Sequence, residues 1–277
     1  MNGIFAPFAF EFFRNGTIAA VLVGALCGLI GVYIVLRGMS YIGHGLSHAI
    51  FGGAVVAFVI QFNFYLGAGI WGFVAALLIN QTVRRTRINA DAAIGVITTA
   101  SFAIGVALIS RYRRFTQSFD AALFGNILGV TQTDVLVIAV VTLLVTVTIF
   151  FLYKQLLFTT FDAEVASVFG VKTQWVETWF ALILAAAIIA SMQILGVTMI
   201  AAALVIPAIV ARLLTDSFHR MVVLSTAIGA FSGLAGMYLS FYVDISSGAT
   251  IVLLQAVLFC LALLINKRSD RVIHTHV

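Results

Sequence analysis

The sequence has 277 residues, of which 62% are hydrophobic and only 9% are charged, and its mean hydropathy is +1.15. Soluble globular proteins carry about 25% charged residues, so this composition excludes a soluble domain with a single anchor. The apolar runs are continuous and as long as a membrane-spanning helix, whereas the strands of a β-barrel would alternate in polarity. We therefore predict an all-α polytopic membrane protein.

The net charge is +5, and the sequence has two cysteines. There is no basic stripe interleaved with aromatic residues, so we expect no nucleic-acid binding. Cys27 and Cys260 lie in apolar runs without metal-ligand spacing and are read as small core residues. The N-terminus has no basic region followed by a small-residue cleavage site, and we expect no cleavable signal peptide.

The elements are predicted in chain order from these apolar runs. Residues 1–15 are rich in Phe but too short to cross, which indicates an interfacial segment along the lipid headgroups. The first span contains Gly24 and Gly28, whose spacing predicts a close helix contact, and Asp91 is expected to cap the fourth span. Eight or nine spans make up a membrane domain over residues 16–265, before a tail at 266–277; they lie at about 16–36, 40–61, 65–83, 91–110, 134–153, 177–193, 195–213, 221–242 and 248–265.

Two stretches between the predicted spans have sequences that do not predict a membrane crossing. Residues 111–132 begin with Arg111, Arg113 and Arg114, and their second half, 119–131, is apolar but too short to cross, which favours a re-entrant or gate helix. Residues 158–175 predict a short amphipathic helix. Asp162 and Glu164 are expected to cap and solvate it, and Gly170 to end it.

The distribution of Lys and Arg predicts the orientation of nine spans. Placing the loop at 84–87 in the cytoplasm also places the 158–175 helix and the C-terminal tail there, and the N-terminus outside. The three arginines at 111–114 then lie outside, where they meet either lipid headgroups or an acidic partner. Asp120 and Asp244 lie at the outer mouth, where each attracts cations or caps a helix.

His44 and His48 open the second span and are four residues apart, which puts both imidazoles on one helix face. Ionisable groups in a membrane span are costly and usually functional, and paired imidazoles suit a divalent transition metal. The alternative is hydrogen bonding between helices. Ser47, between them, is read as a packing residue. Counted along the helix, both histidines fall within two or three turns of the inner surface.

Other functions have less support in the sequence. There is no Walker A motif, so ATP must be bound by another subunit. A metallohydrolase would need a glutamate between the histidines, and His44-Gly45-Leu46-Ser47-His48 has none. A gradient-driven carrier or channel stays as the alternative function, although neither mid-span carboxylates nor an inverted repeat support it. His274 and His276 belong to a polar tail, where disorder is the default and weak metal binding the alternative.

Several motifs follow one another between about residues 16 and 265: Val35-Leu36-Arg37-Gly38-Met39-Ser40, Ile42-Gly43 with Ser47-His48-Ala49, Arg84 to Arg87 with Asp91 and Ala93-Ile94-Gly95, Phe124-Gly125-Asn126-Ile127-Leu128-Gly129, Leu195-Gly196-Val197 with Ile206-Pro207-Ala208, and Gly233-Leu234 with Asp244 and Gly248-Ala249. Taken in this order, they resemble the permease subunits of the ABC-type manganese, zinc and iron uptake transporters.

This resemblance implies a fold like that of type II ABC importers, a homodimeric pore, two cytoplasmic ATPase subunits and an extracytoplasmic metal-binding protein. It implies that residues 162–171, with Val168, form the coupling helix that docks into the ATPase. The cargo implied is Mn²⁺ or Zn²⁺, or Fe²⁺, with no resident cofactor. This sequence has His44 where the family commonly has aspartate, which leaves the choice of ion open.

Overall fold

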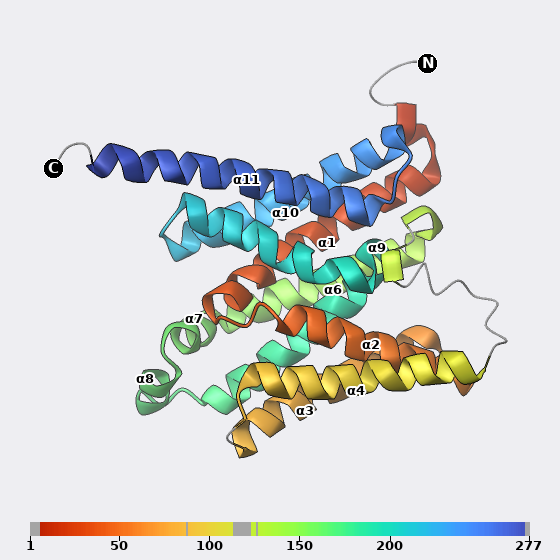
Figure 1. Cartoon of the computed structure of the whole chain (residues 1–277), viewed down its shortest axis with the longest axis horizontal. Coiled ribbons are helices and arrows are strands. Elements are labelled where there is room, and N and C mark those ends of the chain that lie inside the picture. The colour runs from red at the N-terminus through yellow and green to blue at the C-terminus, as the bar shows by residue number, and fades with distance from the viewer. Residues whose placement is uncertain (1–5, 87, 113–122, 126, 275–277) are drawn as a thin grey trace.

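The computed structural model describes residues 6–86, 88–112, 123–125 and 127–274, and within these residues the regular structure is helical (Figure 1). Eight of the described helices are long and apolar enough to cross a membrane, which confirms the all-α polytopic prediction. These helices are α1 Glu11–Leu36, α2 Ile42–Val59, α3 Phe64–Arg85, α4 Ala90–Arg111, α6 Gln132–Phe151, α9 Thr173–Leu214, α10 Phe218–Val243 and α11 Ser247–His274.

Short helices lie at the two ends of this bundle. The 3-10 helices η1, Ala6–Ala9, and η2, Ile127–Gly129, lie beside the first residues of α1, and α7, Tyr153–Phe161, lies beside the C-terminal end of α1 and is followed by α8, Ala163–Val168. Figure 1 shows α7 and α8 on the left, on the side toward which α11 runs. We call this side the α8 end of the bundle.

Helix α1 is packed closely against α10 through small residues. A Cβ atom added at Gly24 would overlap the carbonyl group of Gly229, and one added at Gly28 would overlap that of Ser225. The Ser225 hydroxyl donates a hydrogen bond of 2.6 Å to the Gly28 carbonyl. The close contact predicted from the glycine spacing is confirmed, and it fixes α1 as a buried scaffold, because the two backbones approach without side chains between them.

Helix α9 spans 42 residues and reverses its direction at Gly196, whose backbone is non-helical with φ +71° and ψ 157°. The ring of Tyr33 contacts Phe180, early in α9, at 6.3 Å and Phe218, just after its end, at 5.6 Å. Both ends of α9 therefore lie at the α8 end, and its two halves run in opposite directions. This explains why eight helices correspond to nine predicted spans: the sixth and seventh are the two halves of α9.

The first helix begins earlier than predicted. Helix α1 starts at Glu11 instead of residue 16, so it takes in part of the segment predicted to be interfacial, and residues 1–5 lie outside the described residues. The ring of Phe13 is fully buried, with edge contacts to Tyr238 at 5.7 Å and Phe241 at 5.2 Å. Aromatic partners on α10 thus hold this segment in the bundle, which the sequence of the segment alone does not reveal.

Two helix ends were also placed differently. The side chain of Asn89, rather than Asp91, caps α4 by accepting a hydrogen bond of 2.9 Å from the Ala92 amide. Helix α11 continues past the predicted end of the last span and reaches His274, so the first part of the tail is helical. His276 lies outside the described residues.

Candidate functional site

The two predicted histidines form a pair in α2. Their Nε2 atoms are 3.2 Å apart, and the ring centroids are 4.5 Å apart with nearly perpendicular planes. Both side chains are half-buried. As neutral rings they can share one hydrogen bond, or both can turn an Nε2 lone pair toward a single cation.

The separation of these nitrogens suits the binding of one shared metal ion. Two zinc–imidazole bonds of about 2.05 Å at a tetrahedral angle hold their nitrogens about 3.3 Å apart, close to the observed Nε2 separation. The pair therefore needs little rearrangement to act as two of the ligands of one metal ion.

Surrounding residues fix the position of the pair. The ring of His48 contacts Phe102 of α4 at 4.7 Å, and His44 contacts Tyr41 at 5.4 Å. Phe102 lies in the middle of α4, so the pair is near the middle of the bundle. Counting residues along the predicted second span had instead indicated a position close to the inner surface. Ser47 is fully buried and donates to the carbonyls of His44 at 2.8 Å and Val197 at 3.1 Å, which agrees with its predicted packing role.

The pair supplies only part of a coordination sphere. Among the described residues no group of three or more His, Cys, Asp or Glu could hold a metal. The Nδ1 atom of His48 is buried and has no hydrogen-bond partner among the residues that the structure describes. Ligating histidines usually donate this second nitrogen to an acceptor, which strengthens binding. The arrangement is therefore typical of a weak site rather than of a permanent structural metal centre.

The predicted outer gate lies against the reversal of α9. A Cβ atom at Gly196 would overlap the backbone of Leu123 and of Gly125, and the Thr198 hydroxyl donates a hydrogen bond of 2.7 Å to the Leu123 carbonyl. In the described part of this segment, residues 123–124 are helical and η2 covers Ile127–Gly129; the rest of the predicted re-entrant helix lies outside the described residues. Residues 113–122, which include Arg113, Arg114 and Asp120, lie outside the described residues.

Asp244 is far from the histidines in chain order and in the fold. It ends α10 with a left-handed backbone, φ 57°, and its amide donates to the Ser240 carbonyl at 3.0 Å. Its side chain is exposed, at the end of α10 opposite to the α8 end. It terminates α10 in a left-handed conformation, which aspartate adopts more readily than most residues.

The predicted amphipathic segment divides into α7, α8 and the start of α9. Asp162 caps α8 by accepting a hydrogen bond of 2.9 Å from the Val165 amide, and Gly170 ends the turn with φ +83°. Glu164 is exposed in the first turn. Val168 is 84% exposed and Phe169 is 74% exposed. Two large apolar side chains at a helix end are typical of a docking surface.

Arg37 joins this segment to the helix that precedes the histidines. Its Nε atom donates to Thr160 at 3.1 Å and its Nη2 atom to Thr159 at 3.0 Å, while the guanidinium lies 4.4 Å from the ring centroid of Phe180. A single arginine in a motif gives no sign of which distant hydroxyls it reaches.

Fold and site together define a polytopic membrane protein with a pair of neighbouring histidines inside its helical bundle. The model of the ABC 3 transport family matches residues 9–266, and the chain belongs to this family of ABC transporter permeases. This confirms the relationship that the sequence motifs predicted.

Individual relatives cover nearly the whole chain. It is 36% identical over 261 residues to the manganese transport system membrane protein MntC of Halalkalibacterium halodurans, covering 94% of this chain and 89% of that protein. It is 34% identical over 261 residues to a probable iron transport system membrane protein of Haemophilus influenzae, covering 94% and 96%. The solved structure of PsaBC from Streptococcus pneumoniae in complex with Fab matches with a TM-score of 0.82 and 32% identity, covering 91% of each chain.

Proposed function

We propose that this chain is the membrane-spanning permease subunit of an ATP-driven importer of a divalent transition metal ion. The observation that carries the proposal is the pair of Nε2 atoms 3.2 Å apart, half-buried in the middle of a helical bundle. An ionisable pair in this position is costly unless it has a function. The relatives named for manganese and iron transport support the same cargo class.

A second copy of the chain completes the ion site in this proposal. One copy offers two imidazole nitrogens, and a two-fold axis beside α2 would bring four together. The ion loses most of its water on entry, and the imidazoles replace it. Mn²⁺ and Fe²⁺ bind nitrogen ligands more weakly than Zn²⁺, and weak binding favours release, so we assign Mn²⁺ or Fe²⁺ as cargo before Zn²⁺.

The α8 end faces the cytoplasm in this proposal, with the N-terminus outside and the C-terminus inside. Cytoplasmic ATPase subunits dock on α8 through Val168 and Phe169, which are exposed. An extracytoplasmic binding protein delivers the ion at the other end, where the segment at 123–129 packs against the α9 reversal. ATP-driven movement of α8 rearranges the helices and opens the site inward.

Uptake by the complete complex in liposomes tests the proposal, with Mn²⁺, Fe²⁺ and Zn²⁺ supplied in turn. We expect His48→Ala to abolish uptake and His44→Asp to keep it, with a changed preference among the ions. His219→Ala is the matched control, because it removes an exposed imidazole at the start of α10. Full uptake by His48→Ala would contradict the ion site, and uptake without ATP would favour a gradient-driven carrier instead.

A further inference from the structure

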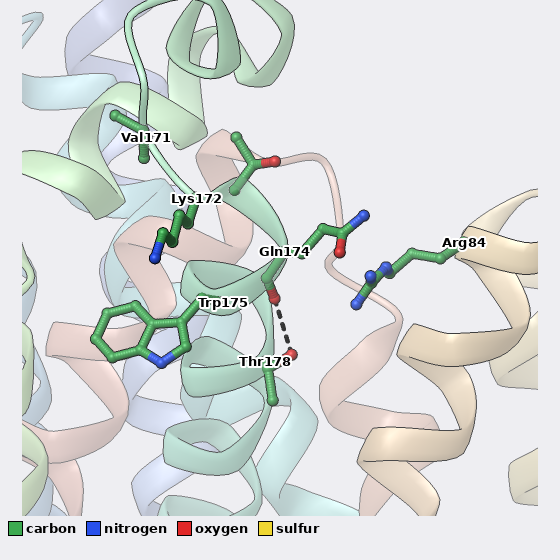
Figure 2. A pocket seen from close by; sticks show the side chains of 7 residues that line it. Arg84, Val171, Lys172, Gln174, Trp175 and Thr178 are labelled. Atoms are coloured by element: carbon green, nitrogen blue, oxygen red, sulfur yellow. Dashed lines mark hydrogen bonds between the residues drawn. The ribbon is translucent and has the colours of Figure 1, made fainter.

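Two adjoining pockets, a basic one at the α8 end and an apolar one deeper in the bundle, suggest a second ligand. The first has a volume of about 530 Å³ and is lined by residues that include Arg84 of α3 and Lys172, Gln174 and Trp175 at the start of α9. Figure 2 shows Arg84 pointing from α3 toward Gln174, and Lys172 lying beside Trp175. Both basic side chains are exposed. The pocket also contains the first residue of α9, Thr173, so the positive end of the helix dipole adds to its attraction for anions.

The second pocket is an apolar groove of about 350 Å³ between α3, α6 and α9. Phe73, Leu144, Leu182 and Ile183 are among the residues that line it. The polar group of Thr148, which also lines it, is satisfied within its own helix, because its hydroxyl donates to the Leu144 carbonyl at 2.7 Å. The groove therefore presents hydrocarbon to its contents.

Two tryptophans connect the pockets. Trp175 lines the basic pocket and Trp179 the apolar groove, and their ring centroids are 5.8 Å apart. They are 50% and 39% exposed. At the boundary, Asn80 of α3 donates a hydrogen bond of 3.2 Å to Thr178 of α9, which holds the two helices together. Tryptophan side chains gather where lipid headgroups meet acyl chains.

We propose that this face binds one anionic phospholipid, with its phosphate at Arg84 and Lys172 and an acyl chain in the groove beside Trp179. Basic pockets between membrane helices suit anionic headgroups, and charge complementarity together with the adjoining hydrocarbon groove selects a lipid over a soluble phosphate. A docked ATPase would contact the basic pocket but not the groove deeper in the bundle. The placement in the inner leaflet rests on the proposed function; the lipid binding itself does not.

Quenching of tryptophan fluorescence by lipids with brominated acyl chains tests the proposal on the full chain, without metal or ATP. The Trp71→Phe background leaves Trp175 and Trp179 as the emitting residues, because the sequence has three tryptophans. We expect phosphatidylglycerol to quench at a lower mole fraction than phosphatidylcholine, with the preference falling by roughly fivefold for each basic side chain lost in Arg84→Gln and Lys172→Gln.

Arg85→Gln is the matched control, because it removes the neighbouring charge, which does not line the pocket, and it should keep the preference. Equal quenching by both lipids, or an unchanged preference in the double variant, would overturn the proposal. Displacement by inorganic phosphate alone would show a soluble-anion site instead. Loss of quenching in the complete complex would show that this face belongs to the ATPase contact. A failure of metal uptake would leave this binding result unaffected.

Discussion

Replacing Arg37 with methionine tests whether the α8 region is mechanically attached to the helix that leads into the histidine pair. The change removes the two hydrogen bonds to Thr159 and Thr160 and the cation above Phe180, but it keeps an unbranched apolar stem. Both threonine hydroxyls retain their own bonds to carbonyls of α7, at 2.9 Å and 2.6 Å. No buried hydroxyl therefore loses its only partner, and the chain should still fold.

The magnitude follows from these contacts. Hydrogen bonds from a charged donor contribute about 1.5 kcal/mol each at the low end, and a partly buried cation–π contact contributes about 1 kcal/mol. Methionine recovers about 1 kcal/mol through its own contact with the ring. The net loss is about 3 kcal/mol, which shifts the equilibrium between attached and detached α7 by on the order of 100-fold. Burial lowers the pKa of Arg37 while the Glu177 carboxylate opposes that shift, and an arginine stays charged at neutral pH.

The assay is the number of metal ions imported per ATP hydrolysed by the complete complex in liposomes. We expect this ratio to fall by roughly tenfold or more in Arg37→Met, because movement of a detached α7 no longer reaches α1, while ATP hydrolysis continues. Arg212→Met is the matched control, since it removes an exposed arginine near the end of α9, at the same end of the bundle. A ratio equal to that of the unmodified chain would refute the reasoning.

Three further substitutions probe the docking surface, the reversal and the site. Val168→Asp puts a charge on the exposed tip of α8, and we expect ATP hydrolysis to become independent of metal, measured with the purified complex. Gly196→Ala combines a left-handed backbone, φ +71°, with overlap on the neighbouring segment; it should lower thermal stability by more than about 2 kcal/mol, whereas Gly69→Ala, which meets open space, should not. Gly45→Ala would press on Ile94 of α4 and push α4 away from the histidine pair, so metal affinity measured by calorimetry should fall although both ligands remain.

Much of the fold was predictable because lipid allows few solutions. A continuous apolar run must form a helix that satisfies its own backbone, so length and punctuation give most of the spans within a few residues. The reversal of α9 was also foreseeable. An apolar stretch of 42 residues is about twice what one crossing requires, and the predicted break between the sixth and seventh spans falls within two residues of Gly196.

What the sequence missed depends on contacts between distant residues. The burial of Phe13 requires Tyr238 and Phe241 of α10, and nothing within residues 1–15 indicates those partners. The contacts of Arg37 likewise join residues more than 120 positions apart. Local sequence patterns predict helix periodicity and caps, but they do not predict which residue on another helix a side chain will contact.

The depth of the histidine pair in the bundle was also not predictable from local sequence. This depth explains how one short helix, α2, is connected to both ends of the bundle. Measured along α2, the pair belongs to the first two turns, yet Phe102 of α4 places His48 near the middle. From that position, Ser47 reaches the α9 reversal through Val197, and the reversal contacts the segment beginning at Leu123. Toward the α8 end of the bundle, the N-terminus of α2 follows a short loop, and Arg37 at the start of this loop is hydrogen-bonded to α7. A shift at either end of the bundle can thus reach the imidazoles through two or three contacts, as the proposed mechanism of alternating access requires.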